Sequence, residues 1–182
     1  MIKKWKHIES KFDKDYRIFR INIEKAICPR TKKPNEFYVI DTSDWVNIIP
    51  ITEDKKVVMI QQYRQGLREI SLEIPGGLVD NESPRDAAVR ELLEETGYTG
   101  EHVSFLGSTS PNPAIFNNLC HTFLVENVKK TANPNLDHDE DIETVLIPIE
   151  EIPSLINNGT INHSLVIVAF HFYFQKMNHH KA

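Results

Sequence analysis

The alternation of apolar and polar residues predicts two strands near the start of the chain. Residues 16–23 alternate polar with apolar side chains, and residues 36–41 form a second run rich in apolar residues. A period of two is typical of a half-buried strand. The basic segment at residues 29–34 begins and ends with proline, which favours a turn. We therefore expect a β-hairpin within residues 1–44, a strand-rich extension before the main domain.

Later apolar runs predict a sheet interspersed with helices over residues 45–182, the main domain. Strands are expected at residues 46–51, 57–63, 103–108, 121–125 and 144–148, and the chain is expected to leave the sheet at residues 62–65. Helices are expected at residues 84–96, 150–157 and 164–176, the last with a core face of Val166, Ala169, Phe170 and Tyr173. This order predicts an α/β fold in which a mixed sheet is sandwiched between helices in α/β/α layers.

The most distinctive stretch is a loop that runs into an acidic helix, between Gly76 and Tyr98. Ser83 suits the N-cap of that helix, and Gly97 suits the left-handed position after its last residue. At about 100° per residue, the helix carries two opposite faces. One face holds Glu91, Glu94 and Glu95, and the other holds Val89, Leu92 and Leu93.

Three carboxylates on one helical face repel one another, and only Arg90 lies near enough to pair with one of them, Glu94. A bound cation would remove that cost. Carboxylates without nitrogen or sulfur neighbours suit a hard ion, Mg²⁺ first and Mn²⁺ next. Most Glu-rich helices simply present a solvated face, but a solvated face needs no fixed spacing back to Glu82 and Gly76. We therefore expect a metal site here.

The residues of this stretch resemble the signature of the Nudix hydrolases. That signature is Gly, five residues, Glu, seven residues, then Arg-Glu-apolar-x-Glu-Glu-x-Gly-apolar, and only Tyr98 departs from it, where an aliphatic residue is usual. The resemblance covers roughly residues 38–176 and implies the same α/β/α sandwich with Mg²⁺-dependent hydrolysis of a diphosphate. It implies metal ligands at Glu91, Glu95, Glu94 and the backbone next to Gly76, with Arg90 and Glu82 fixing the loop and orienting the ligands.

The segments before the signature are similar to the Nudix subgroup that hydrolyses ADP-ribose and related nucleoside diphosphate sugars. A strand is followed by Q-Y-R, ending at Arg64, and then by L-E-x-P-G-G, which contains Glu73. The resemblance implies that Arg64 clamps a phosphate or a carboxylate, and that Glu73, Tyr38 and Pro113 also contribute to substrate binding. Pro113 is followed by Ala114 where the subgroup usually has Gly. ADP-ribose would yield AMP and ribose 5-phosphate.

A short acidic loop at residues 133–141 leads directly into a predicted strand. Such charge runs are usually solvated linkers. In the enzymes that this chain resembles, however, a loop at this place supplies a carboxylate to the metals or to the attacking water. We expect Glu140 to have this catalytic role, with Asp139 and His138 as alternatives.

Composition limits the possibilities further. The chain has 182 residues, of which 40% are hydrophobic and 26% charged, as in an ordinary soluble domain. A net charge of −5 argues against general binding of nucleic acid or of an anionic membrane. The longest apolar run, at residues 161–174, is too short to span a bilayer. Cys28 and Cys120 lack metal-like spacing and read as reduced, buried thiols of a cytoplasmic protein without a signal peptide.

The N-terminal hairpin carries aromatic residues but is too short to form its own core. These residues are Tyr16, Phe19, Phe37 and Tyr38. In the enzymes resembled, the second subunit of a two-fold dimer commonly covers that surface. We therefore expect a homodimer through residues before about 44, the alternative being a hairpin folded onto its own domain.

Two other functions remain open from the sequence. One is hydrolysis of a different nucleotide, such as another nucleotide sugar or a dinucleoside polyphosphate. The other is a sensor that binds a nucleotide without cleaving it. A sensor does not need every metal ligand, whereas here all the signature carboxylates are present.

Overall fold

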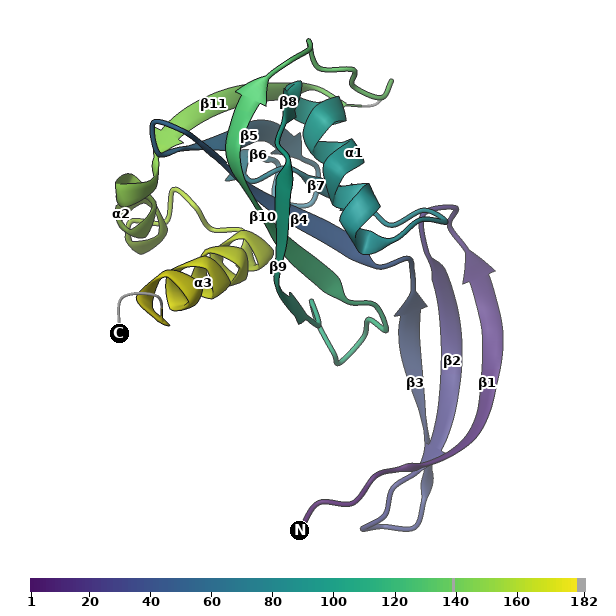
Figure 1. Ribbon diagram of the computed structural model, residues 1–182. Helices are drawn as coiled ribbons and strands as arrows, with labels where there is room; N and C mark the ends of the chain where they lie inside the picture. Colours follow the sequence, from purple (N-terminus) through teal and green to yellow (C-terminus); the bar gives the residue numbers. More distant parts are fainter. Residues whose placement is uncertain (139, 180–182) are drawn as a thin grey trace. The chain divides into compact units, whose positions relative to one another are not determined.

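The computed structural model describes residues 1–138 and 140–179, which form two compact units (Figure 1). The first unit comprises Met1–Ser43 together with Ser110–Leu119. The second begins at Asp44, continues to Thr109, and resumes at Cys120. The sequence pattern did not associate residues 110–119 with the N-terminal strands.

The first unit is built on an antiparallel sheet of three strands rather than two. Its strands are β1 (Lys6–Asp15), β2 (Arg20–Ile27) and β3 (Pro34–Asp41), in that spatial order. The expected hairpin is the β2–β3 pair, but Tyr16 and Phe19 form the turn before β2, where the amide of Tyr16 donates to the carbonyl of Phe19. The sequence missed β1 because all ten of its residues are exposed, which leaves no period-two pattern to read.

The second unit contains a mixed sheet of eight strands. They are β4 (Trp45–Thr52), β5 (Lys56–Arg64), β6 (Glu69–Glu73), β7 (Gly76–Leu78), β8 (Tyr98–Thr99), β9 (His102–Thr109), β10 (Cys120–Lys130) and β11 (Ile142–Pro148). Strands β4 and β10 are parallel, and their other neighbours are antiparallel. The chain leaves β5 at Gln65, within the expected segment 62–65, but it returns to the sheet as β6, a strand that the sequence did not predict.

Helices cover both faces of this sheet, as the α/β/α expectation requires (Figure 1). They are α1 (Pro84–Thr96), α2 (Ile152–Asn157), which follows the 3-10 turn Ile149–Glu151, and α3 (Ser164–His179). Along β4, Val46 and Ile48 pack in the cluster beneath α1, whereas Ile49 and Ile51 pack in the cluster that includes Phe170 of α3. Alternate residues of one strand therefore supply two cores.

Several local expectations are confirmed. Ser83 caps α1, its hydroxyl oxygen accepting the amide N–H of Asp86 at 3.1 Å. The predicted core face of α3 lies in the core, with Val166, Ala169 and Phe170 fully buried and Tyr173 packed against them. Both cysteines are free and buried.

Within the part of the chain that the structure describes, none of the helices combines the length and apolarity that a membrane span requires.

Gly97 ends α1 in the left-handed conformation, with φ of 73°. Its amide donates to the carbonyl of Leu93 at 2.8 Å, and its own carbonyl accepts the amides of Thr131 and Ala132. A side chain here would also overlap the carbonyl oxygen of Ala132. The end of the helix is thereby tied to the segment that follows β10.

We predict that Gly97→Ala lowers the free energy of unfolding by about 2 kcal/mol or more, because the left-handed conformation and the overlap both penalise a Cβ atom. Gly66→Ala is the matched control, since a Cβ on Gly66 would meet nothing within 4 Å. Its effect should stay within about 0.5 kcal/mol, or be stabilising. Urea unfolding of both variants tests the difference, and equal midpoints would contradict it.

Candidate active site

Helix α1 turns two of its carboxylates inward, contrary to the faces read from the sequence. Val89 and Leu93 are 39% and 38% exposed, so they do not form the core face. The buried residues of the helix are Ala87, Ala88, Glu91, Leu92, Glu95 and Thr96. Small alanines let the helix lie close to the sheet, and this packing rotates Glu91 and Glu95 towards β7. The carboxylate face and the buried face of α1 therefore overlap.

Two consecutive glycines let β7 fit between β4 and this helix. In the register of the sheet, Gly76 lies opposite Asn47 and Gly77 opposite Val46. A Cβ on Gly76 would overlap the carbonyl oxygen of Val46, and one on Gly77 would overlap the carboxylate of Glu91. The amide of Gly76 donates to Oε2 of Glu95 at 2.9 Å. The glycines therefore allow the backbone to approach both carboxylates.

Arg90 holds the loop and the helix together. Its Nε donates to Oε1 of Glu82 at 2.9 Å, and its Nη2 donates to the carbonyl of Leu78 at 3.1 Å. Its Nη1 contacts Oε1 of Glu91 at 2.9 Å and Oε2 of Glu94 at 2.8 Å. The expected pair with Glu94 is thus present, and Glu82 lies where it fixes the loop. One guanidinium orients three carboxylates.

Burial gives the inward carboxylates unusual acidities. Burial raises the pKa of Glu95 to about 8; the amide of Gly76 opposes this rise, and the charges of Glu91 and Glu140 add to it. Burial also raises the pKa of Glu91, against the lowering effect of Arg90. Without a cation, ionising both groups in this place is therefore costly.

The acidic loop brings Glu140 towards this pair. The amide of Asn135 donates to the carbonyl of Glu94 at 2.8 Å, which fastens the loop to α1. The carboxylate of Glu140 accepts the amide of Asp137 at 3.0 Å, and its charge acts on the pKa of both Glu91 and Glu95. Glu140 and its alternative His138 are both exposed, and Asp139, the other alternative, lies outside the described residues.

Arg64 clamps a carboxylate of its own chain. Its Nε and Nη2 reach the two oxygens of Glu73 at 2.8 and 2.6 Å, across the β5–β6 hairpin. Burial of Glu73 opposes its ionisation, but this ion pair holds its pKa below the usual value. Arg64 also lowers the pKa of Glu95, so its charge is felt at the inward carboxylates. A bidentate pair keeps the guanidinium in one orientation.

The other two predicted substrate-binding residues belong to the first unit. Tyr38 lies on β3 and is 63% exposed, and Pro113 lies exposed in the segment 110–119. The amide of Ile40 donates to the carbonyl of Ile115 at 2.7 Å, which joins β3 to that segment. The structure therefore brings the Tyr38 strand and the Pro113 loop together within the first unit.

Sequence reasoning missed two residues of the site, Gly77 and Asn47. Gly77 makes room for Glu91, and Asn47 lies opposite Gly76 with a buried amide nitrogen that has no hydrogen-bond partner among the described residues. Asn47 sits in an apolar run that reads only as a strand. Its position beside the signature glycine emerges from the register of β4 with β7.

The donor set suits a divalent metal ion. Among the described residues, no group of three acidic, histidine or cysteine side chains forms a complete protein cage for a metal. Magnesium is usually held by one or two carboxylates, while water and substrate phosphates complete its octahedron. Glu91 and Glu95 supply two buried carboxylates whose pKa values are raised mainly by burial, which Arg90 and Arg64 offset only in part. A divalent cation would add the positive charge that favours ionisation of both groups.

Comparisons with known proteins agree with this geometry. Residues 43–168 match the model of the NUDIX domain. The chain is 30% identical over 173 residues to the methanol dehydrogenase activator of Bacillus methanolicus, covering 92% of this chain and 94% of that protein. It is 30% identical over 118 residues to the ADP-ribose pyrophosphatase of Bacillus subtilis (strain 168), covering 64% of each.

Two further comparisons concern a mammalian relative and a solved structure. The chain is 28% identical over 151 residues to the ADP-sugar pyrophosphatase of Mus musculus, covering 76% of this chain and 68% of that protein. The crystal structure of an ADP compounds hydrolase superposes with a TM-score of 0.86 at 21% identity, covering 99% of this chain and 97% of that chain. This similarity shows the fold.

We predict that Glu95 makes the metal-free protein less stable as the pH rises. Its pKa is about 8 in the folded chain against an ordinary 4.5, so between these values the folded state keeps a proton that the unfolded state releases. The contribution of this protonated carboxyl to the free energy of unfolding is fully present below pH 4.5 and is lost as the pH rises towards 8. Glu95→Gln cannot titrate, so its Tm relative to wild type should rise with pH.

Thermal unfolding with a chelator at several pH values between 5 and 8 measures this difference. Added Mg²⁺ should restore wild-type stability most at the highest pH, where Glu95 is ionised, and should help the variant less. Parallel Tm curves for the two proteins would contradict the prediction.

Proposed function

This chain belongs to the Nudix family, and from that premise we propose that it hydrolyses the diphosphate bond of a nucleoside diphosphate linked to a sugar. ADP-ribose is the substrate we favour, with AMP and ribose 5-phosphate as products. The observation that carries the proposal is the buried pair Glu91 and Glu95 facing the backbone of Gly76 and Gly77. The names of the two pyrophosphatase relatives support the substrate class.

The ion we propose is Mg²⁺, with Mn²⁺ as a substitute. Glu91 and Glu95 are the principal ligands, joined by the backbone carbonyl next to Gly76 and by Glu94, which shares Arg90 with Glu91. Bound there, the ion would neutralise the negative charge of the diphosphate and lower the pKa of a water molecule.

The remaining side chains of the second unit orient the reactants. Arg64 offers positive charge to a phosphate while Glu73 fixes its orientation. Glu140 accepts the proton of the attacking water, whose oxygen forms a bond to phosphorus as the bridging phosphorus–oxygen bond breaks. Arg90 acts as a positioning residue because it holds Glu91, Glu94 and the loop at Leu78 in one arrangement.

The first unit supplies the nucleoside contacts and the dimer contact in this proposal. Tyr38 presents an exposed ring that suits stacking against a base, and Pro113 stiffens a neighbouring loop of the same unit. Ile8 and Phe12 are exposed apolar residues of its strand β1 and need a cover, for which we propose a second subunit. The two free thiols suit the reducing cytoplasm, where we propose that the protein resides.

A substrate panel tests the function. With Mg²⁺, the wild-type protein should cleave ADP-ribose faster than other nucleotide sugars, dinucleoside polyphosphates and nucleoside triphosphates. Glu95→Gln keeps the shape but removes a ligand charge, so kcat should fall by about 10²-fold or more. Exposed Glu101 provides the control Glu101→Gln, which should retain activity. Product analysis should identify AMP.

Turnover of none of these compounds would defeat the enzyme proposal, and tight binding of an intact nucleotide sugar in its place would favour a sensor. Near-normal activity of Glu95→Gln at saturating Mg²⁺ would show that α1 does not hold the metal.

Light scattering tests the dimer. The full chain should have twice its monomer mass of 21.0 kDa. Lysine at Ile8 and Phe12, which are 48% and 57% exposed on β1, should shift the equilibrium towards monomer. Leu146→Lys is the control, because Leu146 is similarly exposed, at 45%, on β11 of the second unit. A monomeric wild-type chain, or equal masses for all variants, would refute the dimer.

A further inference from the structure

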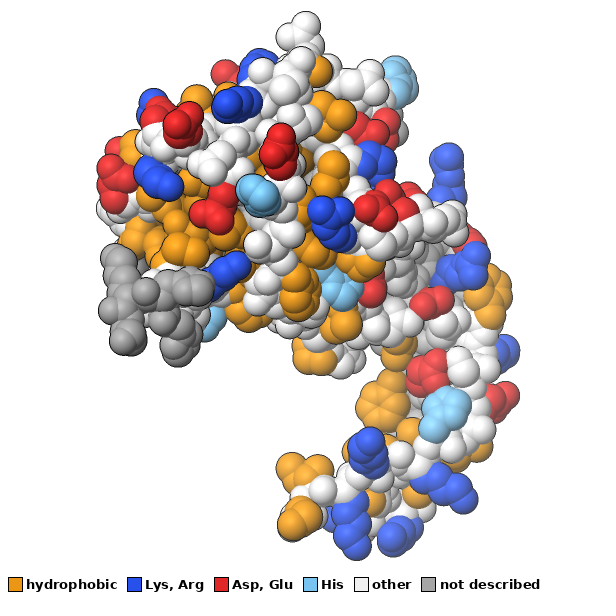
Figure 2. All heavy atoms as spheres, viewed as in Figure 1, with side chains coloured by type: hydrophobic (Ala, Val, Ile, Leu, Met, Phe, Trp, Pro, Cys, Tyr) orange, Lys and Arg blue, Asp and Glu red, His pale blue; other side chains and the backbone are white. Residues whose placement is uncertain are grey.

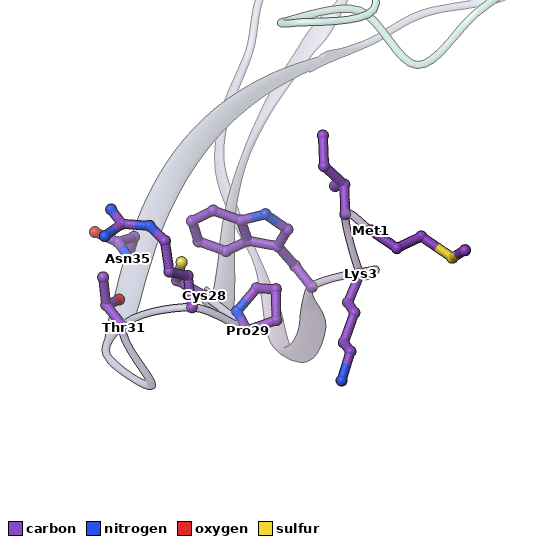
Figure 3. A pocket seen from close by; sticks show the side chains of 9 residues that line it. Met1, Lys3, Cys28, Pro29, Thr31 and Asn35 are labelled. Atoms are coloured by element: carbon purple, nitrogen blue, oxygen red, sulfur yellow. The ribbon is translucent and has the colours of Figure 1, made fainter.

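A cavity of about 830 Å³ opens at one end of the N-terminal sheet, within the first unit. Its lining residues are Met1, Ile2, Lys3, Trp5, Cys28, Pro29, Arg30, Thr31 and Asn35. Figure 3 shows Cys28, Pro29, Thr31 and Asn35 on one side of it and Met1 and Lys3 on the other. We call it the tip pocket. None of the residues assigned above to hydrolysis lines it.

Positive charge is concentrated around the tip pocket. Residues 1–6 and 28–35 together contain no Asp or Glu and hold Lys3, Lys4, Lys6, Arg30, Lys32 and Lys33. The whole chain has a net charge of −5. Because these six cations contribute +6, the remaining residues have a net charge of −11. Figure 2 shows Lys and Arg side chains gathered at that end of the sheet. Such separation of charge attracts an acidic partner and orients its approach.

The tip pocket also presents an apolar anchor. Trp5 packs its ring edge-on against Phe37, at 5.3 Å between centroids, yet remains 43% exposed. Pro29 adds a second apolar surface, and Arg30 lies next to it in the lining. Exposed tryptophan and arginine beside a concave surface are the side chains that most often dominate protein–protein interfaces. An extended polyanion such as duplex DNA makes no use of an apolar cavity.

The turn that carries three of the cations is fixed before any partner arrives. The amide of Cys28 donates to the carbonyl of Lys33 at 3.0 Å, and the amide of Lys32 donates to the carbonyl of Cys28 at 2.8 Å. The side-chain amide of Asn35 donates to the carbonyl of Lys33 at 3.3 Å. A preformed turn loses little conformational entropy on binding.

We propose that the tip pocket docks an acidic segment of a partner protein. An apolar side chain of that segment enters the cavity beside Trp5, and its carboxylates contact the surrounding lysines and Arg30. None of the residues that we assign to hydrolysis lines the tip pocket, so the proposal stands whether or not the chain cleaves a nucleotide.

Cys28 provides a reporter of occupancy in the unmodified chain. It lines the tip pocket and, although largely buried, is 8% exposed there; hydrogen bonds from Thr31 also lower the pKa of its thiol, which favours alkylation. Cys120 serves as the internal control, because burial raises the pKa of its thiol to about 12 and leaves it 1% exposed. Mass spectrometry of the two cysteine peptides separates their alkylation rates by iodoacetamide.

The probe is a short synthetic peptide of Asp and Glu with one central Phe, titrated into the full chain at low salt. It should slow alkylation of Cys28 in a saturable, salt-sensitive manner. Replacing its Phe by Ser should weaken binding about tenfold or more, as expected for loss of one buried aromatic ring. A Lys version of the peptide should give no protection.

Three variants complete the test. Lys3→Gln and Trp5→Leu should each weaken protection by the acidic peptide, whereas Lys11→Gln, on β1 outside the tip pocket, should not. Arg30 is left in place because its charge acts on the pKa of Cys28. Each protection ratio is taken within one variant, with and without peptide.

Three results would overturn the proposal. They are no protection at millimolar peptide, equal effects of the Lys3 and Lys11 variants, and stronger protection by duplex DNA or anionic vesicles than by the peptide. Stronger protection by DNA or vesicles would assign the tip pocket to a different class of partner.

Discussion

The site of this protein depends on the cost of burying two carboxylates side by side. Glu91 and Glu95 lie on the packed face of α1, where burial raises both pKa values, and Arg90, Arg64 and one backbone amide offset their charge only in part. A fold does not keep such an arrangement for stability alone, because apolar residues would pack there at lower cost. The same burial that destabilises the ions makes the place receptive to a small divalent cation.

The sequence predicted the chemistry of the site better than its geometry. The spacing from Gly76 to Gly97 singled out the helix that carries the buried carboxylates, because each fixed position has a backbone or charge requirement. The helical wheel still misplaced Val89 and Leu93, since apolarity alone does not show which face the alanines let approach the sheet. Asn47 was not predicted as a site residue for a related reason, because the register that places it opposite Gly76 depends on tertiary structure.

The sequence pattern predicted the strands that are largely buried, such as β4 and β5. It did not predict the exposed β1 or the short β6 and β7, which have few residues and are ordered by pairing with neighbouring strands. Residues 110–119 gave no local signal of the strand they join. Long-range backbone pairing such as that between Ile40 and Ile115 leaves no trace in a local pattern.

That pairing also makes the first unit discontinuous in the gene. Its sheet is translated early, but the segment that completes it emerges only after most of the second unit's sheet and α1 have been synthesised. During synthesis, β1–β3 therefore lack residues 110–119 until the ribosome has made the part of the second unit that lies between them in the sequence. An exchange of the N-terminal strands alone between relatives would separate β3 from the loop that its backbone hydrogen-bonds.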